Sequence, residues 1–404
     1  MTDAPPETTI FPMPRAAGRP FDPAPELARR SKEEPVSRVR LWDGTTPWLV
    51  TAYEDVRAVL ADPRVGVDVA EPGFPHTNAV SKARDARMKT LMQMDAPEHT
   101  AHRRLLTADF MVKKMEALRP RIQRVVDDLI DDLLAGPNPA DLVEALALPV
   151  PSLVICELLG VPYADRAFFQ RVAGELVMDE GDPARALAAG EELNAYLEAL
   201  VAAKSADPGE DVLSRLAVEQ YGTGAMTLRE IATMGQLLLV AGHDTTANMI
   251  ALGTAALLAN PGQLAAVRDG DPALVANAVE ELLRYLSITH TEARRVARED
   301  LEIGGRLIRK GEGIVVVKST ANRDPSAFPD PDVLDVRRRV RHHVAFGYGV
   351  HQCLGQPLAR VELQVVYGTL YRRIPTLALA TPPSELAFKQ QAVFYGVREL
   401  PVTW

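Results

Sequence analysis

The stretch FGYGVHQCLG, residues 346–355, decides how this chain of 404 residues is interpreted. Glycines at 347, 349 and 355 let the backbone approach another group closely and adopt positive φ angles. The sequence that follows Cys353, LGQPLARVELQVV, is helix-forming, so we expect the sulfur near a helix N-terminus. Unpaired N–H groups and the helix dipole at such a position lower the pKa of a thiol. The stretch therefore indicates a cysteine prone to form a thiolate.

The chain has two cysteines, Cys156 and Cys353. One isolated thiolate cannot build a tetrathiolate zinc or iron–sulfur site, but it can be the single axial ligand of a haem. The alternative for each is a buried structural cysteine, and this is what we expect for Cys156 in the apolar segment PSLVICELL. Two cysteines also cannot form a disulfide framework, which favours a reducing, cytoplasmic location.

The extended stretch FGYGVHQCLGQPLAR resembles the haem-binding signature of the cytochromes P450. That signature reads Phe, two residues, Gly, one residue, His, one residue, Cys, one residue, Gly. Its places are filled by Phe346, Gly349, His351, Cys353 and Gly355. The resemblance runs in order from about residue 38 to residue 404. It is nearest to the soluble bacterial P450s that hydroxylate secondary metabolites, steroids and foreign compounds.

The resemblance implies a haem b (iron protoporphyrin IX) with Cys353 as the iron ligand. It also implies that cationic side chains bind the haem propionates. In DAPEHTAHRR these are His99 and Arg103, which are spaced i, i+4 and share a helix face. Arg295 and His351 complete the set. The remaining residues expected at the cofactor are Ala241, Phe346, Gly347 and Gly355.

The segment AGHDTT, residues 241–246, lies in the middle of the longest expected helix, 227–259. Thr227 followed by Glu230 is a capping box that predicts where this helix begins. Glycine and threonine weaken a helix interior, so we expect a local distortion with room for a diatomic molecule and water. The resemblance implies that Asp244 and Thr245 manage protons for O–O cleavage. The alternative is an ordinary kinked packing helix.

Glu281 and Arg284 are three residues apart and face the same side of an expected helix. Such a pair is common on protein surfaces. The resemblance implies a buried structural pair joined by a third cation, which we assign to Arg337 in DVLDVRR.

Long helical patterns and few short strands predict a mainly α (α+β) fold of the P450 type. We expect a helical body with small β-sheets, and the haem between the long central helix and the helix after Cys353. Residues 1–35 are a Pro-rich leader packed on the surface, and 36–404 form a single haem-binding monooxygenase domain. Apolar runs such as 237–241 are far shorter than the roughly 18 residues of a membrane span.

The composition excludes two further classes. Hydrophobic residues make up 47% and charged residues 25% of the chain, which is incompatible with disorder. The 45 Lys and Arg against 54 Asp and Glu give a net charge of −9, which disfavours nucleic-acid binding.

The implied function is a monooxygenase that uses O2 to hydroxylate a bulky hydrophobic small molecule. The chain carries no flavin or nicotinamide fingerprint, so we expect electrons from NAD(P)H to arrive through a ferredoxin and its reductase. A basic run at 337–341 is a candidate docking surface, and we expect a monomer. A haem-thiolate gas sensor and a haem-thiolate isomerase or dehydratase remain open alternatives. Candidate substrate contacts, each of which could equally be ordinary core, are Met88, Met92, Met94, Met178, Leu238, Ile288, Val393 and Phe394.

Overall fold

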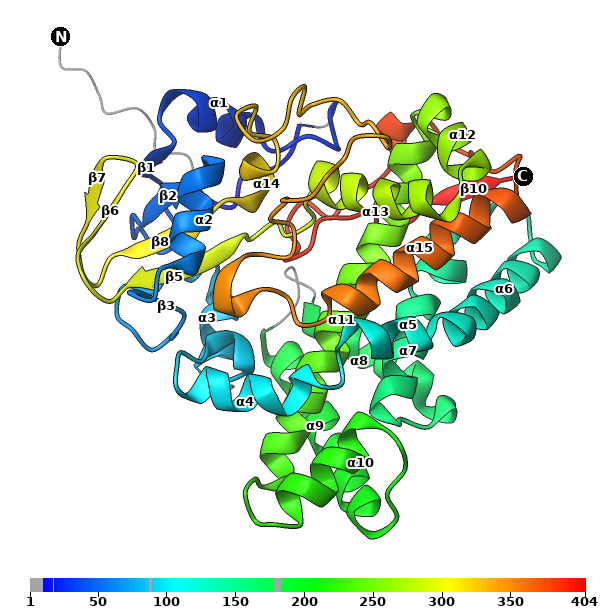
Figure 1. The fold of residues 1–404 in the computed structure, drawn as a ribbon, viewed down its shortest axis with the longest axis horizontal. Coiled ribbons are helices and arrows are strands. Elements are labelled where there is room, and N and C mark those ends of the chain that lie inside the picture. The colour runs from blue at the N-terminus through cyan, green and yellow to red at the C-terminus, as the bar shows by residue number, and fades with distance from the viewer. Residues whose placement is uncertain (1–9, 17, 87–88, 178–182) are drawn as a thin grey trace. The chain divides into compact units, whose positions relative to one another are not determined.

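The structure is a computed structural model that describes residues 10–16, 18–86, 89–177 and 183–404. Helices dominate it and the sheets are small, which confirms the predicted mainly α fold (Figure 1). The chain divides into two compact units. Unit 1 comprises Met1–His99, Glu280–Leu334 and Val340–Cys353, and unit 2 comprises Thr100–Val279, Asp335–Arg339 and Leu354–Trp404.

Within the described residues, unit 1 is built on a five-stranded sheet of order β1-β2-β8-β5-β3 (Figure 1). The β2–β8 pair is parallel and the other pairs are antiparallel. A two-stranded sheet pairs β6 with β7. The strands are β1 (Val36–Arg38), β2 (Trp48–Val50), β3 (Val65–Gly66), β5 (Ala293–Ala297), β6 (Leu301–Ile303), β7 (Arg306–Ile308) and β8 (Gly313–Val316). The helices are α1 (Pro25–Glu33), α2 (Tyr53–Ala61), α3 (Ala79–Asp85), η1 (Leu91–Gln93), α14 (Lys318–Ala321) and η5 (Gly349–His351).

Successive side chains of β2 and β8 point to opposite faces of the sheet, so the core of unit 1 has one cluster on each face. Val50, Ile314 and Val316 face one cluster, which α2 and the segment before Cys353 complete. Leu49 and Val315 face the other, which includes Phe11 and Met13. The Pro-rich N-terminal stretch therefore supplies buried side chains to this core.

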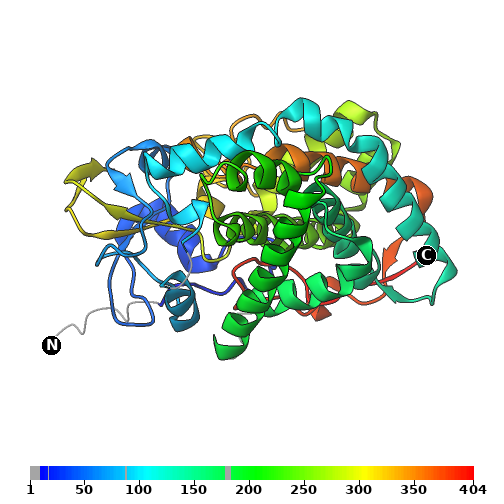
Figure 2. The ribbon, with the colours of Figure 1, turned by 90° about the horizontal axis from the view of Figure 1, so that it is seen from below.

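Unit 2 is a helical assembly around α11 (Leu228–Leu258), which packs against α7, α8, α9 and α15 (Figure 2). Its other helices are α5 (Val112–Ala117), α6 (Arg119–Ala135), η2 (Val143–Ala147), α7 (Pro149–Leu159), η3 (Tyr163–Asp165), α8 (Arg166–Val177), α9 (Pro183–Ala206), α10 (Val212–Leu216), η4 (Ala217–Tyr221), α12 (Pro261–Asp269), α15 (Gln356–Arg373) and η6 (Pro383–Glu385). A small sheet orders β4 (Ala140–Asp141), β10 (Pro401–Thr403) and β9 (Ala378–Leu379) as β4-β10-β9. Two helices have residues in both units, α4 (Glu98–Thr107) and α13 (Pro272–Leu286).

The predicted capping box at the start of α11 is confirmed. Thr227 Oγ1 accepts the backbone N–H of Glu230 at 3.2 Å, and the Glu230 carboxylate accepts the backbone N–H of Thr227 at 2.7 Å. Two of the otherwise unpaired donors at the helix start are thereby satisfied. Among the described helices, no single one is both long and apolar enough to cross a membrane. Helices α11 and α12 meet that criterion only as a pair, with a bend of 113° between them.

Glu281 and Arg284 form a fully buried ion pair on α13. Arg284 Nε and Nη2 donate to the two carboxylate oxygens of Glu281 at 2.7 and 2.8 Å. Arg284 Nη1 donates to the backbone oxygens of Asn322 and Pro331, each at 2.8 Å. The pair thereby ties the end of α13 to the chain that follows β8.

The assignment of Arg337 as the third member of this buried pair is wrong. Arg337 is exposed, and its backbone N–H donates to Asp335 Oδ1 at 3.0 Å in a surface turn. The backbone carbonyl oxygens of Asn322 and Pro331 accept from Arg284 instead. That arrangement avoids the cost of removing another charge from water.

We predict that Glu281→Ala destabilises unit 1 by about 3–5 kcal/mol, because it leaves the Arg284 guanidinium buried without its carboxylate. The matched control is Glu192→Ala, which removes an exposed pair with Arg171 and is expected to cost less than about 1 kcal/mol. Urea unfolding of the three proteins measures both differences. Equal losses in the two variants would show that the buried pair does not stabilise the fold as described.

Candidate active site

The loop before α15 holds Cys353 in a defined turn. Its backbone N–H donates to the carbonyl oxygen of Phe346 at 2.8 Å. Gly347 and Gly349 adopt φ angles of +73° and +74°, a region that side chains disfavour. A Cβ atom on Gly349 would also lie 2.4 Å from the backbone oxygen of Leu60, so only glycine fits there.

Cys353 is exposed, and α15 begins three residues later, at Gln356. The predicted position of the thiol near a helix start is therefore confirmed. Gly355 has no other group within 4 Å of where a Cβ would lie, so the backbone beside the thiol is open. An accessible sulfur on a backbone held by hydrogen bonding is suited to bind a metal from one side.

Unit 1 contains Phe346 and Gly347 of the Cys353 loop and three further predicted cofactor residues, His99, Arg295 and His351. The rings of His99 and His351 lie in contact, with 4.1 Å between their centroids. Arg295, on β5, donates from Nη1 to the backbone oxygen of Arg294 at 2.8 Å. Desolvation lowers the pKa of Arg295 to about 10, against the attraction of Asp95. A guanidinium removed from water in this way favours an anionic partner such as a carboxylate.

The other predicted cofactor and catalytic residues belong to unit 2. Arg103 is partly buried on α4, where its backbone oxygen accepts the hydroxyl of Thr107 at 2.8 Å. Ala241, Asp244 and Thr245 lie on α11, which continues as an α-helix through this segment. Thr245 Oγ1 donates to the Ala241 oxygen at 2.7 Å. The expected local weakening thus takes the form of a hydroxyl bound to a helix carbonyl, not of a break in the helix.

Asp244 is connected to a lysine by an asparagine that the sequence analysis did not identify. Asn248 Nδ2 donates to the Asp244 backbone oxygen at 2.8 Å, and Lys389 Nζ donates to Asn248 Oδ1 at 3.0 Å. Gly396 permits this arrangement, since a Cβ there would lie 2.0 Å from Asn248 Oδ1. Burial raises the pKa of Asp244, and attraction to Lys389 opposes that rise. The pattern Asp-Thr-x-x-Asn on one helix face was the available signal.

Glu362 on α15 is a second buried acid of unit 2 that the sequence analysis missed. Its burial raises the pKa of the carboxyl to about 8, and a hydrogen bond with Thr246 opposes the rise. At neutral pH the group is therefore protonated and can donate a proton. A glutamate on the apolar face of LARVELQVV was the signal for it.

The candidate substrate contacts differ in burial. Met94 and Ile288 in unit 1 and Leu238 in unit 2 are at least nine-tenths buried, and Val393 and Phe394 are half-buried. Met92 is 63% exposed, so its assignment to a pocket wall is wrong. The η1 turn, capped by Thr90 and Gln93, buries Leu91 and leaves Met92 on the surface. Met88 and Met178 lie outside the described residues.

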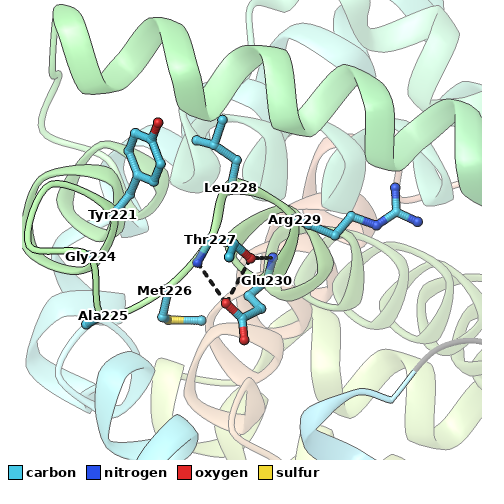
Figure 3. Close-up of a pocket in the computed structure, with 8 residues that line it drawn as sticks. All are labelled: Tyr221, Gly224, Ala225, Met226, Thr227, Leu228, Arg229 and Glu230. Atoms are coloured by element: carbon cyan, nitrogen blue, oxygen red, sulfur yellow. Dashed lines mark hydrogen bonds between the residues drawn. The ribbon is translucent and has the colours of Figure 1, made fainter.

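A hollow of about 480 Å³ at the start of α11 involves none of the predicted site residues (Figure 3). It is lined by Tyr221, Gly224, Ala225, Met226, Thr227, Leu228, Arg229 and Glu230. Figure 3 shows Thr227 and Glu230 turned toward each other in the capping box. The polar groups of Thr227 and Glu230 in this hollow are therefore explained by helix capping.

Comparisons with known proteins show the family to which this chain belongs. A family model described as Cytochrome P450 matches residues 273–376. Cytochrome P450-SU2 of Streptomyces griseolus is 53% identical over 401 residues, 99% of this chain and 98% of that protein. The chain belongs to the cytochrome P450 family. The P450 GfsF, known from Streptomyces halstedii, has a crystal structure 52% identical to this chain. It matches with a TM-score of 0.93 over 98% of this P450 and 99% of that chain.

A further P450 of known structure is the mycinamicin VIII C21 methyl hydroxylase MycCI from Micromonospora griseorubida, bound to mycinamicin VIII. It is 40% identical, with a TM-score of 0.91 over 98% of this chain and 100% of that chain. Membership of the family implies a haem, O2 and electrons from redox partners. The residues described above fit a haem, because they supply an accessible thiol and, in Arg295, a desolvated guanidinium suited to a propionate.

We predict that Glu362→Gln changes how stability depends on pH. The native state of this P450 keeps the Glu362 proton up to about pH 8, whereas an ordinary carboxyl loses it near 4.5. Raising the pH between these values therefore favours the unfolded state, by roughly 1.4 kcal/mol per pH unit. Glu362→Gln has no carboxyl to lose this proton. Its free energy of unfolding should therefore increase relative to that of the parent between pH 5 and pH 8.

Urea unfolding of both proteins at pH 5, 6.5 and 8 measures this change. Glu385→Gln, at an exposed position, is the matched control and should follow the parent at every pH. A constant difference between Glu362→Gln and the parent would contradict the protonated buried acid.

Proposed function

We propose that this P450 inserts one oxygen atom from O2 into a C–H bond of a bulky hydrophobic small molecule. The observation that carries the proposal is the accessible Cys353 thiol in a glycine-dependent loop directly before α15. Haem b is the prosthetic group, and the enzyme is a cytoplasmic monomer formed by a single monooxygenase domain.

When bound, the haem activates oxygen, and its thiolate ligand donates electron density that favours O–O cleavage. Cys353 is the iron ligand. Arg295, with His99, Arg103 and His351, binds the propionates through charge and hydrogen bonds. Ala241, Phe346, Gly347 and Gly355 provide small or flat surfaces that allow close approach to the cofactor.

Protons for the reaction come from Asp244 and Thr245. Burial raises the pKa of Asp244, which makes this carboxyl a better proton carrier than an exposed aspartate. The Thr245 hydroxyl accepts a proton at Oγ1 while it donates its own to the next acceptor. Asn248 and Lys389 restrain the Asp244 segment, and Lys389 keeps the pKa from rising further.

The substrate is bulky and apolar. Met94, Ile288, Leu238, Val393 and Phe394 are the side chains proposed to contact it, and methionine adapts to varied shapes. Support for a large substrate comes from the related hydroxylase whose crystal structure holds mycinamicin VIII.

Electrons from NAD(P)H arrive through a ferredoxin and its reductase. Arg337, Arg339 and Arg341 are exposed within one short run of sequence. A cluster of this kind attracts an acidic partner although the whole chain carries a net charge of −9.

The test of the function uses the purified holoenzyme with a ferredoxin, its reductase and NADPH. Lipophilic compounds are first selected by the shift of the ferric haem from low to high spin. A selected compound should then be hydroxylated with consumption of O2 and NADPH. Spin shift without product would favour a sensor, and product without O2 or NADPH would favour an isomerase or dehydratase.

We predict that Thr245→Ala keeps its haem and its spin shift on substrate binding. The product formed per electron should fall by about tenfold, and the missing electrons should be recovered as peroxide. Thr233→Ala is the matched control, because Thr233 makes the same hydroxyl-to-carbonyl bond on the same helix, to Arg229 at 2.8 Å. NADPH, peroxide and product are measured together. Full coupling of Thr245→Ala would refute the role of this hydroxyl in proton delivery.

A further inference from the structure

Unit 1 contains a buried lysine in addition to the desolvated guanidinium of Arg295. Lys318, at the start of α14, is 9% exposed. Its Nζ donates to the Thr289 hydroxyl oxygen at 3.1 Å. Among the described residues, no carboxylate oxygen lies within 4.0 Å of this ammonium, since none forms an ion pair with it. Lysine is rarely buried without a negative partner.

The nearest acid, Glu292, is occupied elsewhere. Its two carboxylate oxygens accept the backbone N–H groups of Lys318 and Ser319 at 2.8 and 3.1 Å. Burial raises the pKa of Glu292, and the attraction of Lys318 opposes that rise. Desolvation lowers the pKa of Lys318, and the attraction of Glu292 only opposes this change.

The sheet register places Lys318 on the same face as Arg295. Arg295 pairs with Ile314 and Ala293 pairs with Val316, so these side chains share one face of β5 and β8. Val317 is still extended, with φ −88° and ψ 95°, so Lys318 continues the alternation from Val316. Ile314 and Val316 belong to the cluster that contains Val344 and packs against Tyr348, in the segment leading to Cys353.

The electrostatic environment of Lys318 agrees with that placement. Arg295 repels its ammonium, and Cys353 attracts it. Arg295 and Lys318 therefore lie on the same face of β5 and β8, the face that packs against the segment before Cys353. Among the described residues, no carboxylate binds the Lys318 ammonium or the Arg295 guanidinium.

Among the described residues, Lys318 and Thr289 both keep N–H or O–H donors that no described group accepts. The Thr289 oxygen accepts from Lys318, and its own O–H proton is not taken by any group of the described residues. The Lys318 ammonium has two further N–H groups beyond the one that Thr289 accepts. A ligand here must accept several hydrogen bonds and carry negative charge.

We propose that Lys318 and Thr289 form a carboxylate-binding subsite of this P450. The carboxylate is that of a haem propionate or that of a substrate, and both sources use the same chemistry. The first source rests on the proposed haem-dependent function. The Lys318 ammonium binds the carboxylate by charge, and the Thr289 hydroxyl donates a second hydrogen bond that fixes its direction.

Two measurements on the purified holoenzyme distinguish the sources. The first follows transfer of haem to excess apomyoglobin. If the ligand is a propionate, Lys318→Met loses haem about tenfold faster than the parent and Lys318→Arg restores the rate. The second compares dodecanoic acid with its methyl ester by calorimetry. If the ligand is a substrate carboxylate, Lys318→Met binds the acid about tenfold more weakly and the ester unchanged.

Thr289→Val is the second variant and replaces only the hydroxyl by a methyl group. It should speed haem transfer, or weaken binding of dodecanoic acid, by about threefold, whichever of the two Lys318→Met changes. If Lys318→Met does not fold, the result for Thr289→Val decides whether the subsite binds a propionate or a substrate carboxylate. Unchanged haem transfer together with an unchanged preference for acid over ester would overturn the subsite. If the parent is isolated without haem, the proposed function fails, and the calorimetric comparison still tests the subsite.

Discussion

The hydrogen bond from the Cys353 N–H to the Phe346 oxygen is the interaction on which the account of this P450 depends. It closes a turn that requires two left-handed glycines, one of them pressed against the end of α2. This rigid backbone would hold the accessible thiol in place as the proposed iron ligand. Every role assigned to the other residues is defined relative to an iron bound at that sulfur.

The buried charges of the two units fall into two kinds. Glu281 and Arg284 satisfy each other and the surrounding carbonyls, and they hold the fold together. Arg295, Lys318, Asp244 and Glu362 are desolvated with incomplete compensation, and burial shifts the pKa of each toward the neutral form. Such groups cost stability unless a ligand or a proton neutralises them. We propose that their positions mark where this enzyme binds anions and moves protons.

The sequence was informative where a residue type is required by backbone geometry or by local pairing. The glycines of the Cys loop, the capping box of α11 and the Glu281–Arg284 spacing all express such short-range requirements. Arg337 was misassigned because a turn in which its backbone N–H binds Asp335 leaves its side chain exposed. The spacing of residues in the sequence does not reveal this turn. Met92 failed for a similar reason, since one residue of shift in a short turn exchanges the inside for the outside. Asn248, Lys389 and Lys318 depend on long-range contacts that only the folded chain defines.

The most direct measurement of the central claim is the absorption spectrum of the reduced carbon monoxide complex of Cys353→Ser. Cys156→Ser is the matched control, because burial raises the pKa of that thiol to about 12 and keeps it protonated. We predict the red-shifted, thiolate-type Soret band in the parent and in Cys156→Ser, and its loss in Cys353→Ser. Retention of that band without the Cys353 sulfur would contradict the account.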